Sequence, residues 1–308
     1  MQDRSSRWAF LFPLLLAVVA AGSVLVVNWA LDLKQGPVGD ALSARLTWGI
    51  AAMLFLMFFA FTVVACNIVM FRCGAPQHAM FACVVTTVVG LLATLVWTVF
   101  LPNTYLGPPT MKRYLDATAF CVGHVRTLTA LLDGLATWAA VLVVATSGVI
   151  LANEVEDPGD LSRQLRGSKI LMYCAAALLI TGVSAVGALH KWPGHETAPV
   201  SQNCTNTDAQ QMFADPNGKK KVDSTAVAVS TTIGTVASLI LAAAYLPLAI
   251  VLRQRAYRVV KPWERTETWL AVHGFALQPT QQLAKLFLIL SPLMAGGPVS
   301  YLITLLSG

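Results

Sequence analysis

Charged residues are scarce in this chain. Asp, Glu, Lys and Arg make up 12% of its 308 residues, whereas soluble domains carry roughly 25%. Hydrophobic residues make up 56%, and a soluble fold of this size could not keep so much apolar surface away from water. The composition therefore excludes an ordinary soluble protein and predicts that lipid surrounds much of the surface.

Sequence signatures of enzymes are missing as well. The chain has no HExxH, no GxSxG, no phosphate-binding loop and no GxGxxG between a strand and a helix. Its six cysteines include no CxxC pair, so the spacing typical of zinc, iron–sulfur and thioredoxin-like sites is absent. These absences favour a protein that is not an enzyme.

What the chain has instead is long apolar runs. A spanning helix needs about 20 consecutive apolar residues, and six segments reach that length without the alternation of a β-strand: about 8–30, 46–71, 80–101, 128–152, 170–189 and 226–251. The first run is longer than the core of a signal peptide, so we expect it to be retained. The sequence predicts an all-α, polytopic transmembrane helical bundle over residues 1–252, with an outer loop at 191–225.

A seventh apolar stretch, 286–306, follows a polar segment. It is long enough to span, but Pro292 and the run Gly296-Gly297-Pro298 interrupt it. Its first apolar residues recur at helical spacing, opposite Gln282 and Lys285. We therefore expect residues 253–308 to form an amphipathic or re-entrant helical tail on the inner side, and a seventh span is the alternative.

Lysine and arginine residues between the runs indicate the orientation. With six spans and the N-terminus inside, twelve of the 21 lie on the inner side and nine on the outer side, as the positive-inside rule requires. The inner twelve are Arg4, Arg7, Arg72, Arg163, Arg166, Lys169, Arg253, Arg255, Arg258, Lys261, Arg265 and Lys285. The prediction is a multi-pass protein of an inner or plasma membrane with both termini in the cytoplasm.

Two cysteines, Cys121 and Cys204, lie outside in this topology. The other four are within the membrane or inside. The outer pair could form one disulfide in an oxidising compartment. Two unpaired thiols are an equal alternative, because spacing does not determine connectivity.

Ionisable residues inside spans mark ion pathways and proton relays, and here they are nearly absent. Asp133 is the one candidate, with Arg126 seven residues earlier on the same helical face. Either the two form an ion or proton site near the outer leaflet, or Asp133 lies at the interface, since the unbroken apolar stretch begins at Gly134. The scarcity of charge argues against a conventional proton- or sodium-coupled transporter.

Two histidines suggest a cofactor site. Haem b between membrane helices needs two histidines at one depth on different helices, and His124 and His190 both fall at the outer edge of the predicted bundle. Neither stands in a metal-ligand motif. We therefore expect no cofactor, with haem b or a metal at these two residues as the less favoured alternative.

The sixth run carries a stripe of hydroxyl groups. Thr231, Thr235 and Ser238 follow a 0/4/7 spacing on one helical face. Small and hydroxyl residues let membrane helices approach closely, so packing is the simpler interpretation and a hydroxyl-lined pore the alternative. Asn67, in the second run, is expected to hydrogen-bond a neighbouring helix.

These observations favour a non-enzymatic membrane protein that forms a channel-like pore or serves as a membrane subunit of a larger complex. A transporter of a neutral or apolar solute is the second hypothesis, because an uncharged interior suits such a solute. A haem-binding redox protein is the third. The expected partners are the lipid bilayer and either further copies of the chain or other membrane subunits, and no nucleic acid.

Overall fold

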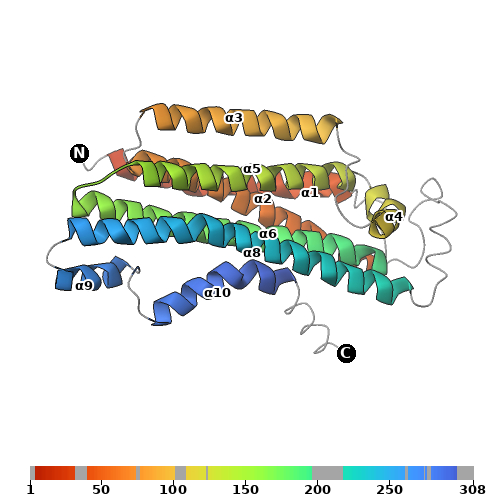
Figure 1. Ribbon diagram of the computed structural model, residues 1–308. Coiled ribbons are helices and arrows are strands. Elements are labelled where there is room, and N and C mark those ends of the chain that lie inside the picture. Colours follow the sequence, from red (N-terminus) through yellow and green to blue (C-terminus); the bar gives the residue numbers. More distant parts are fainter. Residues whose placement is uncertain are drawn as a thin grey trace.

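A computed structural model describes residues 4–31, 40–73, 77–100, 109–122, 124–195, 218–260, 263–273, 275 and 279–296. Every regular element in these ranges is a helix (Figure 1). The elements are α1 (Arg4–Leu31), α2 (Asp40–Arg72), α3 (Gln77–Phe100), α4 (Pro109–Ala117), η1 (Ala119–Cys121), α5 (Val125–Ala152), α6 (Pro158–His195), α8 (Gly218–Val259), α9 (Trp263–His273) and α10 (Pro279–Gly296).

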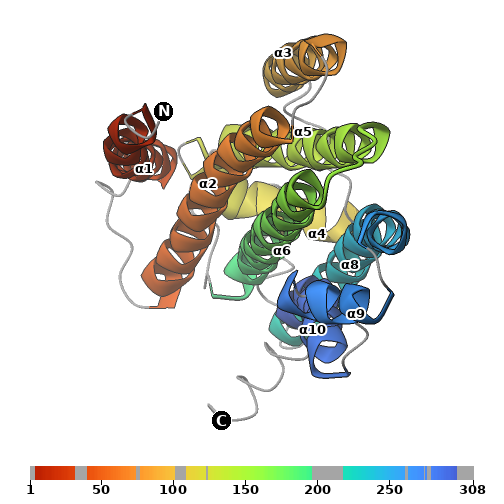
Figure 2. The ribbon, with the colours of Figure 1, turned by 90° about the vertical axis from the view of Figure 1, so that its left-hand side faces the viewer.

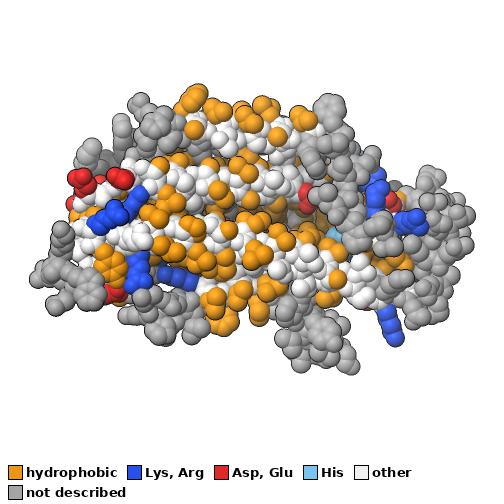
Figure 3. Space-filling view, in the orientation of Figure 1, with side chains coloured by type: hydrophobic (Ala, Val, Ile, Leu, Met, Phe, Trp, Pro, Cys, Tyr) orange, Lys and Arg blue, Asp and Glu red, His pale blue; other side chains and the backbone are white. Residues whose placement is uncertain are grey.

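Four of these helices are long and apolar enough to cross a bilayer. Their apolar segments are Leu42–Arg72, Val125–Ala152, Pro158–His195 and Val222–Val259. In the space-filling view of the described residues, charged side chains gather toward the two ends and hydrophobic side chains fill the band between them (Figure 3). This distribution fits a bilayer with water on either side. The all-helical prediction is confirmed, and four helices have the length and composition to span a membrane.

The predicted number of six spans is not confirmed. The described apolar stretches of α1 and α3 are Val18–Leu31 and Val84–Thr94, both shorter than a span. Both helices lie at the edge of the bundle, α1 beside α2 and α3 on α5 (Figure 2). The centre is formed by α6, which packs between α2 and α8.

Several helices extend well beyond the predicted apolar runs. The fifth run was expected to begin at Ile170, yet α6 begins at Pro158, where the Asp157 carboxylate accepts hydrogen bonds from the backbone N–H groups of Gly159 (2.8 Å) and Asp160 (3.3 Å). An aspartate cap followed by proline is a strong helix start. With 38 residues α6 is about 57 Å long, so its ends project beyond the hydrocarbon layer.

Small residues set how closely the helices pack. A Cβ on Gly167 of α6 would lie 2.9 Å from Val69 of α2. A Cβ on Gly187 of α6 would lie 3.0 Å from the hydroxyl of Ser230 on α8. Close approach at small residues is the usual source of stability between helices in lipid.

The C-terminal helix α10 packs along the side of α8 and α6 (Figures 1 and 2). The backbone N–H of Leu293 donates to the Ser238 hydroxyl at 3.2 Å. A Cβ on Gly234 would lie 2.6 Å from the carbonyl oxygen of Pro292. Ser238 stands midway along α8, so α10 reaches the middle of the bundle. A tail confined to the inner face would not extend that far.

Candidate functional site

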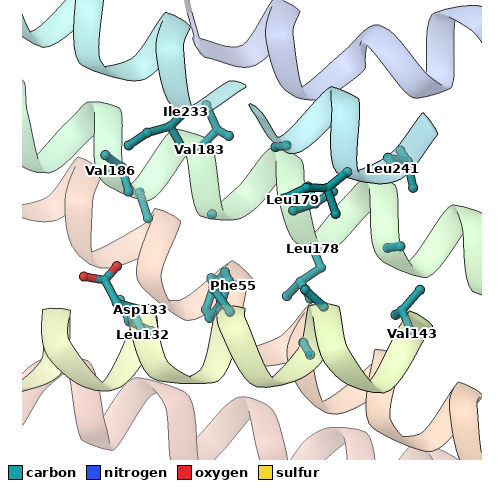
Figure 4. Close-up of a pocket in the computed structure, with 18 of the residues that line it drawn as sticks. Phe55, Leu132, Asp133, Val143, Leu178, Leu179, Val183, Val186, Ile233 and Leu241 are labelled. Carbon is teal, nitrogen blue, oxygen red and sulfur yellow. The ribbon is translucent and has the colours of Figure 1, made fainter. Parts of the chain in front are cut away.

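A cavity of about 200 Å³ lies among α2, α5, α6 and α8 (Figure 4). Its wall is almost entirely apolar, with Trp48 and Phe55 from α2 at one side. Small residues of three helices leave the space unfilled: Ala136, Ala140, Ala175, Gly182, Ala237 and Ala244. Apolar pockets with few polar groups are typical of small-molecule sites.

Asp133 is the acidic residue of this wall. In Figure 4 its carboxylate projects from α5 toward the side where Val186 and Ile233 lie. Thr137 donates only to the backbone carbonyl of Asp133 (3.0 Å), and within the described part of the chain no hydrogen bond or ion pair reaches the carboxylate. An acid without a partner on such an apolar helix is unusual, because ionisable groups in membrane-spanning helices normally pair with another charge or with backbone carbonyls.

Asp133 also marks where the cavity opens. Its side chain is exposed at the surface of the helices, and it lines a second, more open cavity of about 640 Å³ between α3 and α5, with Thr86, Thr94 and Thr137. The site is therefore reachable from the side of the bundle, where lipid chains would lie.

Asp133 lies in the third turn of α5. The helix α5 begins at Val125, eight residues earlier, so Asp133 lies about 12 Å along the helix. A 28-residue helix measures about 42 Å and extends about 6 Å beyond a 30 Å hydrocarbon layer at each end. Centred in that way, α5 would hold Asp133 inside the layer.

Arg126 does not neutralise Asp133. Its guanidinium forms an ion pair with Asp116 of α4 and lies 5.2 Å from the centre of the Phe120 ring. Lys112 lies one helical turn before Asp116 on α4 and also forms an ion pair with it, with Nζ and Oδ2 3.6 Å apart. The structure therefore gives the two residues of the predicted ion site different surroundings.

The two candidate haem ligands have different neighbours. His124 stacks on Trp29 of α1, with ring centres 4.0 Å apart, whereas the buried His190 shares a 2.8 Å hydrogen bond with the carbonyl of Val186 on its own helix. In the described ranges no three His, Cys, Asp or Glu side chains come together as a metal site would require. Haem binding stays a hypothesis without geometric support.

The hydroxyl stripe of α8 divides between two surroundings. Ser238 is buried beneath α10, where it accepts from Leu293. Thr235 is exposed, and its hydroxyl donates to the carbonyl of Thr231 at 2.8 Å. Asn67 donates to Val63 of its own helix at 2.8 Å. Ser238 is therefore enclosed between α8 and α10, whereas Thr235 lies on the exposed surface of α8.

Cys121 is disulfide-bonded, whereas Cys66, Cys73 and Cys174 form no disulfide. Cys204 lies outside the described residues, so its pairing with Cys121 stays a prediction. Cys121 and Cys73 stand at opposite ends of the bundle, here named the Cys121 end and the Cys73 end.

A polar network that the sequence did not suggest joins four helices at the Cys73 end. Arg255 of α8 donates to the carbonyls of Ile150 (3.3 Å), Leu151 and Asn153 (2.8 Å) at the end of α5. Gln164 of α6 donates to the Asn153 carbonyl at 2.9 Å. The Asn153 amide in turn donates to the carbonyl of Cys73, just after α2. The only sequence signal was Asn and Gln close to the predicted helix ends.

Comparisons of the chain with protein-family models, with curated proteins and with solved structures find no match. The cavity and its carboxylate are therefore interpreted from their own geometry. An apolar space with one acidic group at its opening can hold a small hydrophobic body and neutralise one cationic or hydrogen-donating group attached to it.

Proposed function

We propose that this protein binds a small, mostly apolar solute that carries an amine, and moves it into or across the membrane. The observation that supports this function is the unpaired carboxylate of Asp133 at the opening of the apolar cavity. Ionisable residues within spans are costly and mark functional sites in most membrane proteins. An ammonium group would supply the missing partner, and the hydrophobic body would occupy the cavity.

This proposal belongs to the transporter class rather than the pore class. The pore hypothesis relied on Thr231, Thr235 and Ser238 facing one aqueous path. Ser238 is covered by α10 and Thr235 lies on the exposed surface, which weakens that support. The cavity among four helices needs no second copy of the chain, so a single bundle suffices for binding.

The orientation is part of the proposal. Disulfides persist in oxidising compartments and are rare in the cytosol, so the Cys121 end faces the outside. The free Cys73 and the cluster around Arg255 then face the cytoplasm, as the positive-inside rule favours. In this orientation the carboxylate of Asp133 lies in the outer half of the bilayer.

Binding is tested with two probes of nearly equal size, phenethylamine and the neutral 2-phenylethanol. Purified protein in lipid nanodiscs is titrated with each, and the unfolding temperature is followed. We expect the amine to stabilise the protein at concentrations about tenfold lower than the alcohol, because hydrogen bonds to charged groups contribute about 1.5–3 kcal/mol. Asp133→Asn should remove the difference between the two probes.

Two variants make the test specific. Ala140→Phe fills the cavity from α5 and should abolish binding of both probes. Asp160→Asn removes an exposed carboxylate that pairs with Arg163 at 2.8 Å, far from the cavity, and should leave binding unchanged. Amine binding that survives both Asp133→Asn and Ala140→Phe would contradict the proposal. Uptake of the amine into proteoliposomes then separates transport from binding alone.

A further inference from the structure

Two lysines from different helices meet at one aromatic ring at the Cys73 end. The ammonium of Lys285 on α10 lies 4.6 Å from the centre of the Phe275 ring, and that of Lys169 on α6 lies 6.0 Å from it. Phe275 is 5% exposed. Its backbone N–H donates to the Leu270 carbonyl at 2.8 Å, the six-residue bond that closes a helix in the Schellman motif.

Among the described residues, neither lysine has an acidic partner. The ring supplies a weak cation–π attraction, but within the described ranges no carboxylate and no hydrogen-bond acceptor is assigned to either ammonium. Their two charges are close enough to interact, and like charges repel. Both side chains are only partly buried, so an anion could reach them from outside. Two ammonium groups this close together can share one anion.

The surface beside the two lysines is apolar. Leu286 follows Lys285 on α10 and is 52% exposed. On α6, Ile170 and Tyr173 follow Lys169 and are 43% and 58% exposed. Cationic groups next to exposed hydrophobic side chains match the two parts of a phospholipid, a charged headgroup and acyl chains.

We propose that Lys169 and Lys285 together bind the phosphate of an anionic phospholipid, whose acyl chains lie against the exposed faces of α10 and α6. The lipid would bridge α6 to α10, and the phosphate oxygens would accept hydrogen bonds from both ammonium groups. This site is independent of the cavity at Asp133, because no lysine lines that cavity.

The test is titration of the detergent-purified full chain with short-chain lipids. Dioctanoyl phosphatidylglycerol carries the anionic headgroup, dioctanoyl phosphatidylcholine is its neutral counterpart, and inorganic phosphate is the free anion. The midpoint of the rise in unfolding temperature gives an apparent affinity. We expect stabilisation by the anionic lipid at concentrations at least tenfold below those of the neutral lipid, and none by inorganic phosphate up to millimolar concentrations.

Substitutions identify the residues. Lys169→Gln and Lys285→Gln should each lower the apparent affinity for the anionic lipid about fivefold, the size of effect expected for one lysine beside an anionic headgroup. Arg166→Gln removes an exposed positive charge one turn from Lys169 and serves as the matched control; it should change the affinity less than twofold. Lys285→Arg keeps the charge and should keep binding, which separates charge from packing.

The outcomes are distinct. Equal stabilisation by both lipids overturns the proposal, as does an equal loss in Arg166→Gln and in the two lysine variants. Stabilisation by inorganic phosphate as strong as by the anionic lipid also overturns it, because the site would then hold free phosphate. If Lys285→Gln fails to fold, Lys169→Gln and Lys285→Arg still decide the result.

Discussion

Gly90 of α3 faces the indole ring of Trp138 on α5 at a distance that leaves no room for a side chain. A Cβ on Gly90 would lie 1.9 Å from Cδ1 of Trp138. Trp138 is itself buried and packs on Phe59 of α2, with ring centres 5.0 Å apart. The glycine therefore lets α3 dock on the bundle through one large aromatic side chain.

Gly90→Ala should weaken this docking. The added methyl group must displace Trp138, and overpacking of this kind typically costs about 1–3 kcal/mol. The measurement is the unfolding temperature in detergent, with Trp fluorescence as a second readout. Gly148→Ala is the control, since no atom lies within 4 Å of the methyl group it adds. Equal losses in the two variants would show that helix packing at Gly90 is not the cause.

Arg255→Ala should destabilise the Cys73 end of the bundle. The guanidinium satisfies the last carbonyls of α5 and also approaches Gln164 at 3.4 Å, so its removal leaves several acceptors without donors. We expect a loss of about 2 kcal/mol or more. Arg255→Lys should recover only part of the lost stability, because an ammonium group cannot replace a planar guanidinium that donates to several carbonyls at once.

The control for Arg255 is Arg258→Ala on the same helix. Arg258 is exposed and, within the described part of the chain, donates no hydrogen bond to α5. Arg258→Ala should therefore change the free energy of unfolding by less than about 0.5 kcal/mol. Unfolding temperature and protease sensitivity of the 153–157 linker measure both variants. If Arg258→Ala were as destabilising as Arg255→Ala, net charge rather than capping would explain the effect.

Cys73 should react slowly with maleimide at neutral pH. Burial raises the pKa of its thiol to about 11; the Asp160 carboxylate also raises it, while the Arg163 guanidinium lowers it. Because only the thiolate reacts, the labelling rate should rise about tenfold per pH unit from pH 7 to 10. The measurement uses a variant in which Cys66, Cys83 and Cys174 are replaced by Ala, so that Cys73 is the one thiol left outside the predicted Cys121–Cys204 disulfide.

A matched control for Cys73 is Arg72→Cys combined with Cys73→Ser. Position 72 is exposed, so a thiol there should have an ordinary pKa, and its rate should level off near pH 9, about two units earlier than that of Cys73. A Cys73 rate that also levels off near pH 9 would contradict the effect of burial.

The partner of Cys121 can be identified by labelling. If the bond joins Cys204, then Cys204→Ser frees Cys121, and a membrane-impermeant maleimide added to cells labels it without prior reduction. Cys83→Ser should leave Cys121 protected. Labelling from the outside also tests the proposed orientation, because a cytoplasmic Cys121 would stay unlabelled until the membrane is opened. The reverse pattern would contradict the pairing with Cys204, because Cys83 stands near the start of α3, at the Cys73 end.

Much of the helical architecture follows from local sequence. Two of the four helices that could span a membrane end close to the predicted runs, where a polar residue follows the apolar stretch: α2 ends at Arg72 and α5 at Ala152, within one residue of prediction. The start of α6 was missed by twelve residues, because its polar first turns are helical through the Asp157 cap rather than through hydrophobicity.

The candidate site could be predicted only in part. Asp133 was identifiable from the sequence because charged residues are rare in the apolar runs. Its lack of a partner was not, because Arg126, the residue at helical spacing from it, forms an ion pair with Asp116 instead. The small residues that form the cavity looked like packing residues. Whether facing alanines and glycines close together or leave a space depends on helix rotation and crossing, which sequence spacing does not encode.

The sequence by itself determined long apolar helices that suit a membrane, since the length and charge of each run are local properties and a bilayer selects for them directly. Only the tertiary structure decided which side chains meet across helices: the unpaired Asp133 beside its cavity, the Arg255 network, and the two lysines at Phe275. The reason is physical. Lipid is as apolar as the helix faces, so no hydrophobic periodicity specifies which face turns inward.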